Sequence, residues 1–169
     1  MKNIILIGMM GSGKTSVGQA ISQAANLVFI DTDTMIESRL KMTIPHIFAQ
    51  YGEPYFRSLE ADAAQQAATY TGTVIATGGG IVTNPQNMTI LKASGFVIYL
   101  RCSVKQLYIR TEKDNNRPLL NTPTERFTKL ENLLSQREHL YMQYSDLILD
   151  TDKSTIDELS EIILTRIPH

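Results

Sequence analysis

A glycine-rich motif near the start of the chain has the residue types that bind phosphate. Residues 8–15 are Gly-Met-Met-Gly-Ser-Gly-Lys-Thr, which matches the pattern G-x-x-x-x-G-K-[ST], and they directly follow an apolar run at residues 3–7. In such a loop the backbone N–H groups point inward and the next helix begins with its positive end at the same point. The motif predicts that Lys14 contacts the β- and γ-phosphates and that the Thr15 hydroxyl binds Mg²⁺. The residues expected to hold the nucleotide phosphates are Gly11, Ser12, Gly13, Lys14, Thr15 and Ser16.

Two aspartates, Asp31 and Asp33, follow a second apolar run. One alternative is that they only cap a helix, which aspartate does often. Beside a phosphate loop, a carboxylate can also hold Mg²⁺ through water, or accept the proton of an attacking hydroxyl. We expect Asp31 to bind the metal through water and Asp33 to contact the hydroxyl of a substrate.

Three consecutive glycines, Gly78, Gly79 and Gly80, follow a third apolar run. Consecutive glycines cost backbone entropy unless the site requires them. A loose surface turn is the simplest alternative. We expect instead that another group closely approaches this backbone.

Two arginines are candidates for binding an anion. Arg57 has Glu53 and Glu60 at helical spacings, and exposed ion pairs are the simplest interpretation of that pattern. Arg137 falls on the apolar stripe of its own helix, so we expect it to face inward. A buried arginine needs an anionic partner, which is either an internal carboxylate or a ligand, and we favour a ligand. The stripe consists of Phe127, Leu130, Leu134, Tyr141 and Tyr144.

Residues 112–124 are polar and contain two prolines, which predicts a mobile loop. A lid that closes over a transferring phosphoryl group would exclude water and could bring in a positive charge. Arg117 is the candidate for that charge. Without the phosphate loop, an ordinary connection would be the preferred interpretation.

Composition restricts the class of protein. With 169 residues, 43% of them hydrophobic, the chain is long enough for one domain spanning residues 1–169. The net charge of −1 argues against nucleic acid or an anionic membrane as a partner. No apolar run approaches the length of about 20 residues that spans a bilayer. We therefore expect a cytoplasmic monomer, in which the single cysteine, Cys102, has no chemical role.

Five apolar runs alternate with helical segments along the chain. This order predicts an α/β protein with a five-stranded parallel sheet flanked by helices. Ligands of such folds bind at the carboxyl ends of the strands, where the phosphate loop, the aspartates and the three glycines all lie. The predicted strands are residues 3–7, 27–31, 73–77, 96–100 and 146–149.

Taken together, these residues resemble the shikimate kinase family over nearly the whole chain. The resemblance rests on residues 8–15, the Asp31-x-Asp33 pair, the pattern G-E-x-x-F-R-x-x-E at residues 52–60, residues 77–80, the Arg-Pro-Leu-Leu at 117–120, and Arg137 followed by Tyr141. It implies a P-loop, nucleoside-monophosphate-kinase-like fold with a mobile lid. It also implies transfer of the γ-phosphate of ATP, with Mg²⁺, to the 3-hydroxyl of shikimate in the chorismate branch of aromatic amino-acid biosynthesis.

The resemblance also implies roles for individual residues. Asp33 would bind the substrate hydroxyls and act as the base, while Arg57 and Arg137 would bind the shikimate carboxylate. The three glycines Gly78, Gly79 and Gly80 would line the same pocket, within which residues 33–60 form the main substrate-binding region. Arg117 would be the lid arginine, and Arg110 would stack on adenine, with the adenine loop near residues 151–154.

Two other functions remain open on sequence grounds. Another small-molecule kinase, such as gluconate kinase, would also have a phosphate loop and acidic strand ends, although the glycines and the two arginines argue against it. A GTP-driven switch or a non-catalytic nucleotide-binding module is the second alternative. The chain has no N-K-x-D motif for guanine, which argues against that one.

Overall fold

Five parallel strands form the central sheet of the protein. In the computed structural model, which describes residues 2–112 and 123–168, the strand order is β2-β3-β1-β4-β5. Each strand begins and ends within one residue of the predicted position, so the prediction of an α/β fold with a five-stranded parallel sheet is confirmed. The strands are β1 Asn3–Ile7, β2 Val28–Asp31, β3 Thr73–Ala76, β4 Gly95–Arg101 and β5 Leu147–Asp150.

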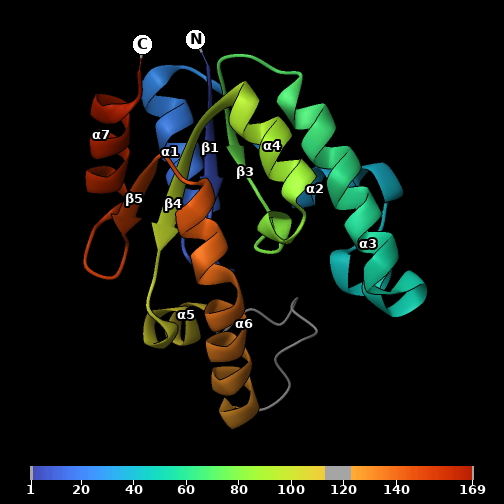
Figure 1. The fold of residues 1–169 in the computed structure, drawn as a ribbon. Helices are drawn as coiled ribbons and strands as arrows, with labels where there is room; N and C mark the ends of the chain where they lie inside the picture. The colour runs from blue at the N-terminus through green and yellow to red at the C-terminus, as the bar shows by residue number, and fades with distance from the viewer. Residues whose placement is uncertain (1, 113–122, 169) are drawn as a thin grey trace.

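Helices connect the strands and cover both faces of the sheet (Figure 1). They are α1 Lys14–Ala25, α2 Thr32–Leu40, α3 Ile44–Ala68, α4 Pro85–Ser94, α5 Val104–Thr111, α6 Pro123–Tyr144 and α7 Ile156–Arg166, with a short 3-10 turn, η1, at Ile81–Thr83. None of the helices described here is long and apolar enough to cross a membrane.

Each face of the sheet has its own hydrophobic core. Ile5 and Ile7 of β1 point to the face covered by α3, α4 and α6, whereas Ile4 and Leu6 point to the face covered by α1 and α7. A strand buried on both faces is apolar throughout, which explains why its sequence does not alternate. β1 is completely enclosed in this way, and its carboxyl end leads directly into the phosphate loop, here defined as residues 8–15.

β1 lies between β3 and β4, with Ile5 level with Ile75 on one side and with Val97 on the other. The carboxyl ends of these neighbouring strands therefore open at one edge of the sheet. In Figure 1 this is the lower edge, toward which the strand arrows point. The topology thus brings the phosphate loop and the segment after β3 together.

The segment from α2 to the first part of α3 forms a small unit beside this edge. Helix α3 is interrupted at Gly52, where φ is 80° and Pro54 follows. Positive φ suits glycine because it has no Cβ, so Gly52 lets the chain change direction there. Five apolar side chains of α2 and α3 form a separate cluster that supports this unit, namely Ile36, Ile47, Phe56, Leu59 and Ala63.

Candidate active site

The phosphate loop has the backbone conformation that its glycines allow. Gly8, Gly11 and Gly13 all have positive φ, at 144°, 79° and 99°. A Cβ on Gly8 would lie 2.7 Å from the carbonyl oxygen of Leu100 at the end of β4, so no larger residue fits there. Gly13 precedes α1 directly and ends the turn. The loop therefore directs the N-terminus of α1 at the cleft, as a phosphate site requires.

Lys14 and Ser12 carry the polar side chains of this loop. The Lys14 ammonium donates hydrogen bonds of 2.8 Å to the carbonyl oxygens of Gly8 and Met9, and the residue is 8% exposed. The Ser12 hydroxyl is buried and has no hydrogen-bond partner among the described residues. A buried hydroxyl normally has a partner, so an unsatisfied one lining the cleft fits a loop built to hold an oxyanion.

Thr15 and Asp31 lie next to each other at the ends of two elements. The Thr15 hydroxyl donates to Oδ2 of Asp31 at 3.0 Å. Oδ1 of Asp31 caps α2 by accepting from the backbone of Asp33 and Thr34. Asp31 therefore does cap a helix, and it also faces the threonine predicted to bind Mg²⁺. Mg²⁺ usually keeps several waters and is held by one or two protein oxygens together with substrate phosphates, which this pair of side chains fits.

Asp33 lies in the first turn of α2 and reaches the segment after β3. A Cβ on Gly78 would lie 2.7 Å from Oδ1 of Asp33 and 3.1 Å from Oε1 of Glu60. The backbone N–H of Gly78 donates to the hydroxyl of Thr32 at 3.1 Å, which fixes the segment against α2. The absence of a side chain at Gly78 is what lets these carboxylates approach.

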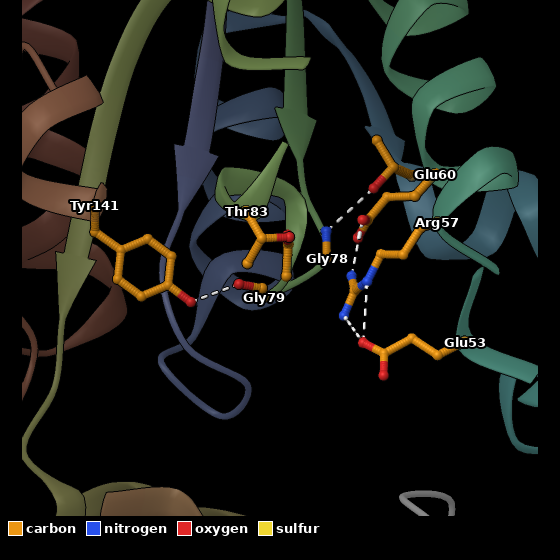
Figure 2. A network of polar contacts seen from close by, with 9 residues as sticks. Glu53, Arg57, Glu60, Gly78, Gly79, Thr83 and Tyr141 are labelled. Carbon is orange, nitrogen blue, oxygen red and sulfur yellow. Dashed lines mark hydrogen bonds and ion pairs between the residues drawn. The ribbon is translucent and has the colours of Figure 1, made fainter. Parts of the chain in front are cut away.

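Arg57 lies between two glutamates of its own helix (Figure 2). Nη1 donates to Glu60 at 2.8 Å, and Nε and Nη2 donate to a single oxygen of Glu53 at 3.3 and 3.1 Å. The two partners differ in burial, because the Glu60 side chain is 1% exposed and that of Glu53 is 63% exposed. The ion pairs predicted from helical spacing are therefore present, but one of them is buried.

The ion pair between Arg57 and Glu60 is largely shielded from solvent. Burial raises the pKa of Glu60, although the positive charge of Arg57 acts in the opposite direction. Burial lowers the pKa of Arg57, but Glu60 and Glu53 outweigh it, so that pKa lies above its ordinary value. The guanidinium therefore stays charged and has a fixed, buried anchor.

Arg137 faces inward, as its place on the helical stripe predicted. It is 9% exposed, and Leu130 and Tyr141 of the same stripe are fully buried. Phe127, the first residue of the stripe, is by contrast 38% exposed and packs edge-on against Tyr108 near the start of α6. The stripe continues along the part of α6 that lies over the sheet.

The triple-glycine turn, residues 78–80, is approached closely by the chain's own polar groups. The Tyr141 hydroxyl donates to the carbonyl of Gly79 at 2.5 Å, as Figure 2 shows. A side chain on Gly80 would collide with the guanidinium of Arg57. None of these three glycines has positive φ, so they serve close packing rather than an unusual backbone conformation.

Arg110 lies on α5, close to Gly11 of the phosphate loop. It donates to the carbonyl and the hydroxyl of Thr151 at 2.6 and 3.0 Å, and to the sulfur of Cys102 at 3.4 Å. Cys102 is 3% exposed, and burial raises the pKa of its thiol to about 11. Arg110 is thus held against the segment at residues 151–154.

One cleft of about 870 Å³ joins these groups. Its size is in the range of small-molecule sites. Every predicted site residue that the structure describes lines this cleft, including the phosphate loop from Gly11 to Ser16, both aspartates, the triple-glycine turn and the arginines at 57, 110 and 137. Arg117, and all of the predicted lid except its ends, lies outside the described residues.

The cleft therefore combines a phosphate site with two buried or half-buried arginines and a carboxylate. A family model described as shikimate kinase matches residues 10–168. The chain belongs to the shikimate kinase family. The sequence-based hypothesis about its family is confirmed.

Individual relatives cover almost the whole chain. A shikimate kinase from Ralstonia nicotianae is 39% identical over 99% of this chain and 87% of its own length, and one from Thioalkalivibrio sulfidiphilus is 44% identical over 95% and 84%. The solved structure of shikimate kinase from Acinetobacter baumannii in complex with shikimate has a TM-score of 0.93 at 36% identity, covering 98% of this chain and 92% of that one. A gluconokinase from Sinorhizobium meliloti, at 16% identity and a TM-score of 0.60, shares the fold.

Sequence reasoning did not predict that Glu60 is buried. The signal was present, because Phe56, Glu60, Ala63 and Ala67 have helical spacing and all are buried on one side of α3. The argument that placed Arg137 on an apolar stripe applies equally to Glu60. Thr32 was also missed, since a hydroxyl that accepts a hydrogen bond from a glycine distant in sequence leaves no local pattern.

Proposed function

We propose that this protein transfers the γ-phosphate of ATP to the 3-hydroxyl of shikimate, giving shikimate 3-phosphate and ADP in aromatic amino-acid biosynthesis. Family membership supports the reaction type. The observation that carries the substrate assignment is the position of Arg57, Arg137 and Asp33 around the triple-glycine turn, in the same cleft as the phosphate loop. A small acid with several hydroxyls suits two arginines and one aspartate, because arginine can bind a carboxylate through two parallel hydrogen bonds.

The donor side of the cleft would bind MgATP. Lys14 and the N-terminus of α1 would neutralise the β- and γ-phosphates, and the unsatisfied Ser12 hydroxyl would donate to a phosphate oxygen. Thr15 would bind Mg²⁺ directly and Asp31 would bind it through water. The metal would supply charge neutralisation on the transferring phosphoryl group. Arg110, held in place by Thr151, would lie against the adenine.

The acceptor side would orient shikimate. We propose that Arg57 and Arg137 bind its carboxylate and that Asp33 accepts the proton of the attacking hydroxyl. Phosphoryl transfer depends mainly on alignment and charge stabilisation, so fixed positions of these groups matter most. Arg117, which lies outside the described residues, is proposed as the lid arginine that meets the phosphates.

We also propose that the protein acts as a monomer. A cytoplasmic location is proposed because ATP is the phosphoryl donor.

The experiment that tests this function is a coupled assay of ADP release with MgATP and shikimate. Gluconate, quinate and nucleoside monophosphates are run as alternative acceptors. Turnover with shikimate and at most slow turnover with the others is the expected result. Turnover with another acceptor but not with shikimate would retain the kinase and reject the proposed pocket.

A further inference from the structure

The hydroxyl of Tyr141 connects helix α6 to the triple-glycine turn. Tyr141 follows Arg137 by one helical turn, so both side chains face the same side of α6. The tyrosine is completely buried, and its hydroxyl donates to the Gly79 carbonyl at 2.5 Å. In Figure 2 it approaches the turn from the side opposite to Arg57.

Gly79 lies between the phosphate loop, on the donor side of the cleft, and Arg137, on the acceptor side. A Cβ on this residue would lie 3.3 Å from the backbone nitrogen of Met10 and 3.5 Å from the carbonyl oxygen of Gly8, both in the phosphate loop. It would also lie 3.7 Å from Nη1 of Arg137. A shift of the Gly79 peptide would therefore change the shape of the cleft between the phosphate loop and Arg137.

We propose that Tyr141 is a positioning residue, whose hydroxyl fixes the Gly79 peptide and thereby the acceptor side of the cleft. Tyr141 is completely buried and does not line the cleft, so it would act through Gly79 and its neighbour Arg137 rather than by touching a substrate. The inference rests on the proposed function, because the acceptor side is where shikimate would bind.

The chemistry of the hydroxyl suits this role. Burial raises the pKa of Tyr141 to about 12, while the nearby Arg137 acts in the opposite direction, so the group remains a hydrogen-bond donor at neutral pH. Removal of the hydroxyl would leave a carbonyl of Gly79 without this partner. A buried acceptor that loses its donor is penalised more than the bond itself contributed, so the peptide would move to find another partner.

The chain offers a matched control in Tyr99. The Tyr99 and Tyr141 rings are stacked with centroids 5.0 Å apart, and both residues are fully buried. Among the described residues, however, the Tyr99 hydroxyl has no hydrogen-bond partner. Tyr99→Phe therefore removes a buried hydroxyl from the same aromatic pair without breaking a hydrogen bond.

The test compares wild type, Tyr141→Phe and Tyr99→Phe by steady-state kinetics and thermal unfolding. In Tyr141→Phe we expect the KM for shikimate to rise about three- to tenfold, the value of one hydrogen bond, with the KM for ATP changed less than about twofold. In Tyr99→Phe both KM values should stay within about twofold of wild type. KM does not depend on the fraction of enzyme that is folded, so it remains measurable even if Tyr141→Phe is partly unfolded.

A purely structural role for Tyr141 would lower the melting temperature and the active fraction, and so the apparent kcat, while both KM values stayed constant. That result, or equal KM values for the two variants, would overturn the inference. Failure of the proposed function is distinguishable, because the wild type itself would then show no turnover with shikimate.

Discussion

Thr15 and Asp31 are joined by a hydrogen bond of 3.0 Å between the threonine hydroxyl and Oδ2 of the aspartate. The other oxygen of Asp31 caps α2. One carboxylate therefore connects the first turn of α1 with the start of α2, and the phosphate loop with the segment that carries Asp33. The charge of Asp31 and its capping ability can be separated by mutation.

Asp31→Asn keeps an oxygen that can cap α2 but removes the negative charge. We expect the concentration of free Mg²⁺ that gives half-maximal activity to rise several-fold, with little change in melting temperature. Asp31→Ala should in addition lose about 1 kcal/mol of stability, because the cap is lost. Magnesium titrations of activity at constant total ATP, with thermal unfolding, measure both effects.

Asn84→Ala is the control for a lost cap, since Asn84 caps α4 through the backbone of Gln86 and does not line the cleft. It should be less stable but have an unchanged Mg²⁺ dependence. If Asp31→Asn also has the Mg²⁺ dependence of wild type, Asp31 is a helix cap only.

Lys14→Ala is expected to lower kcat by about 100-fold or more, because it removes the positive charge that stabilises the negative charge on the phosphates in the transition state. The Lys14 ammonium donates to carbonyls of the phosphate loop itself, so the fold should survive the change. Circular dichroism and the coupled assay check the two expectations. Near-normal turnover would show that the phosphate loop has been misinterpreted.

Glu60 should give shikimate binding a pH dependence. Burial raises its pKa above the ordinary value of 4.5, so the carboxylate that anchors Arg57 takes up a proton at a higher pH than an exposed glutamate does. The KM for shikimate should rise as the pH falls through this raised pKa. Glu60→Gln should have a higher KM that is flat over the same range, and identical pH profiles for the two proteins would contradict the prediction.

The stability effect of Glu60 has the opposite trend with pH. The folded protein binds this proton more tightly than the unfolded chain, so the contribution of Glu60 is fully present below pH 4.5 and is lost as the pH rises through the raised pKa. Relative to Glu60→Gln, the free energy of unfolding of the wild type should therefore fall as the pH rises. Urea denaturation of both proteins across this range provides the measurement.

Most of the fold could be predicted from the sequence because its signals are local. Each strand is a short apolar run, and the phosphate loop is marked by glycines at fixed positions. Arg137 could be placed because helical periodicity alone decides which way it faces. The same logic did not extend to Phe127, since a periodic pattern does not show where the neighbouring elements end.

Residue spacing alone does not show which groups approach the triple-glycine turn, although the family resemblance placed Asp33, Arg57 and the glycines in one pocket. The three glycines indicated close contact, but Arg57, Asp33 and Tyr141 come from segments that only the folded chain brings together. Likewise the helical spacing of Arg57 and its two glutamates predicted ion pairs without showing that one glutamate is buried and the other exposed. That difference depends on how α3 packs, which is a tertiary property.

The exposed glutamate leads to a prediction about substrate affinity. Glu53 accepts hydrogen bonds from Nε and Nη2 of Arg57, whereas Glu60 holds only Nη1. A substrate carboxylate could form two hydrogen bonds with the same two nitrogens, Nε and Nη2, that Glu53 occupies. Glu53 would then compete with the substrate for Arg57, and its exposed pair is weak enough to be displaced.

Glu53→Gln is therefore expected to lower the KM for shikimate by about two- to fivefold, with kcat unchanged. A change of this size corresponds to the free energy of one exposed ion pair. Asp62→Asn is the matched control, because it removes the same charge from the same helix while Asp62 pairs with Arg39 instead. Measuring both variants at low and moderate salt separates the local competition from a general change in charge. A higher KM in Glu53→Gln would show that Glu53 holds Arg57 in its binding position, and that the two glutamates act together rather than in opposition.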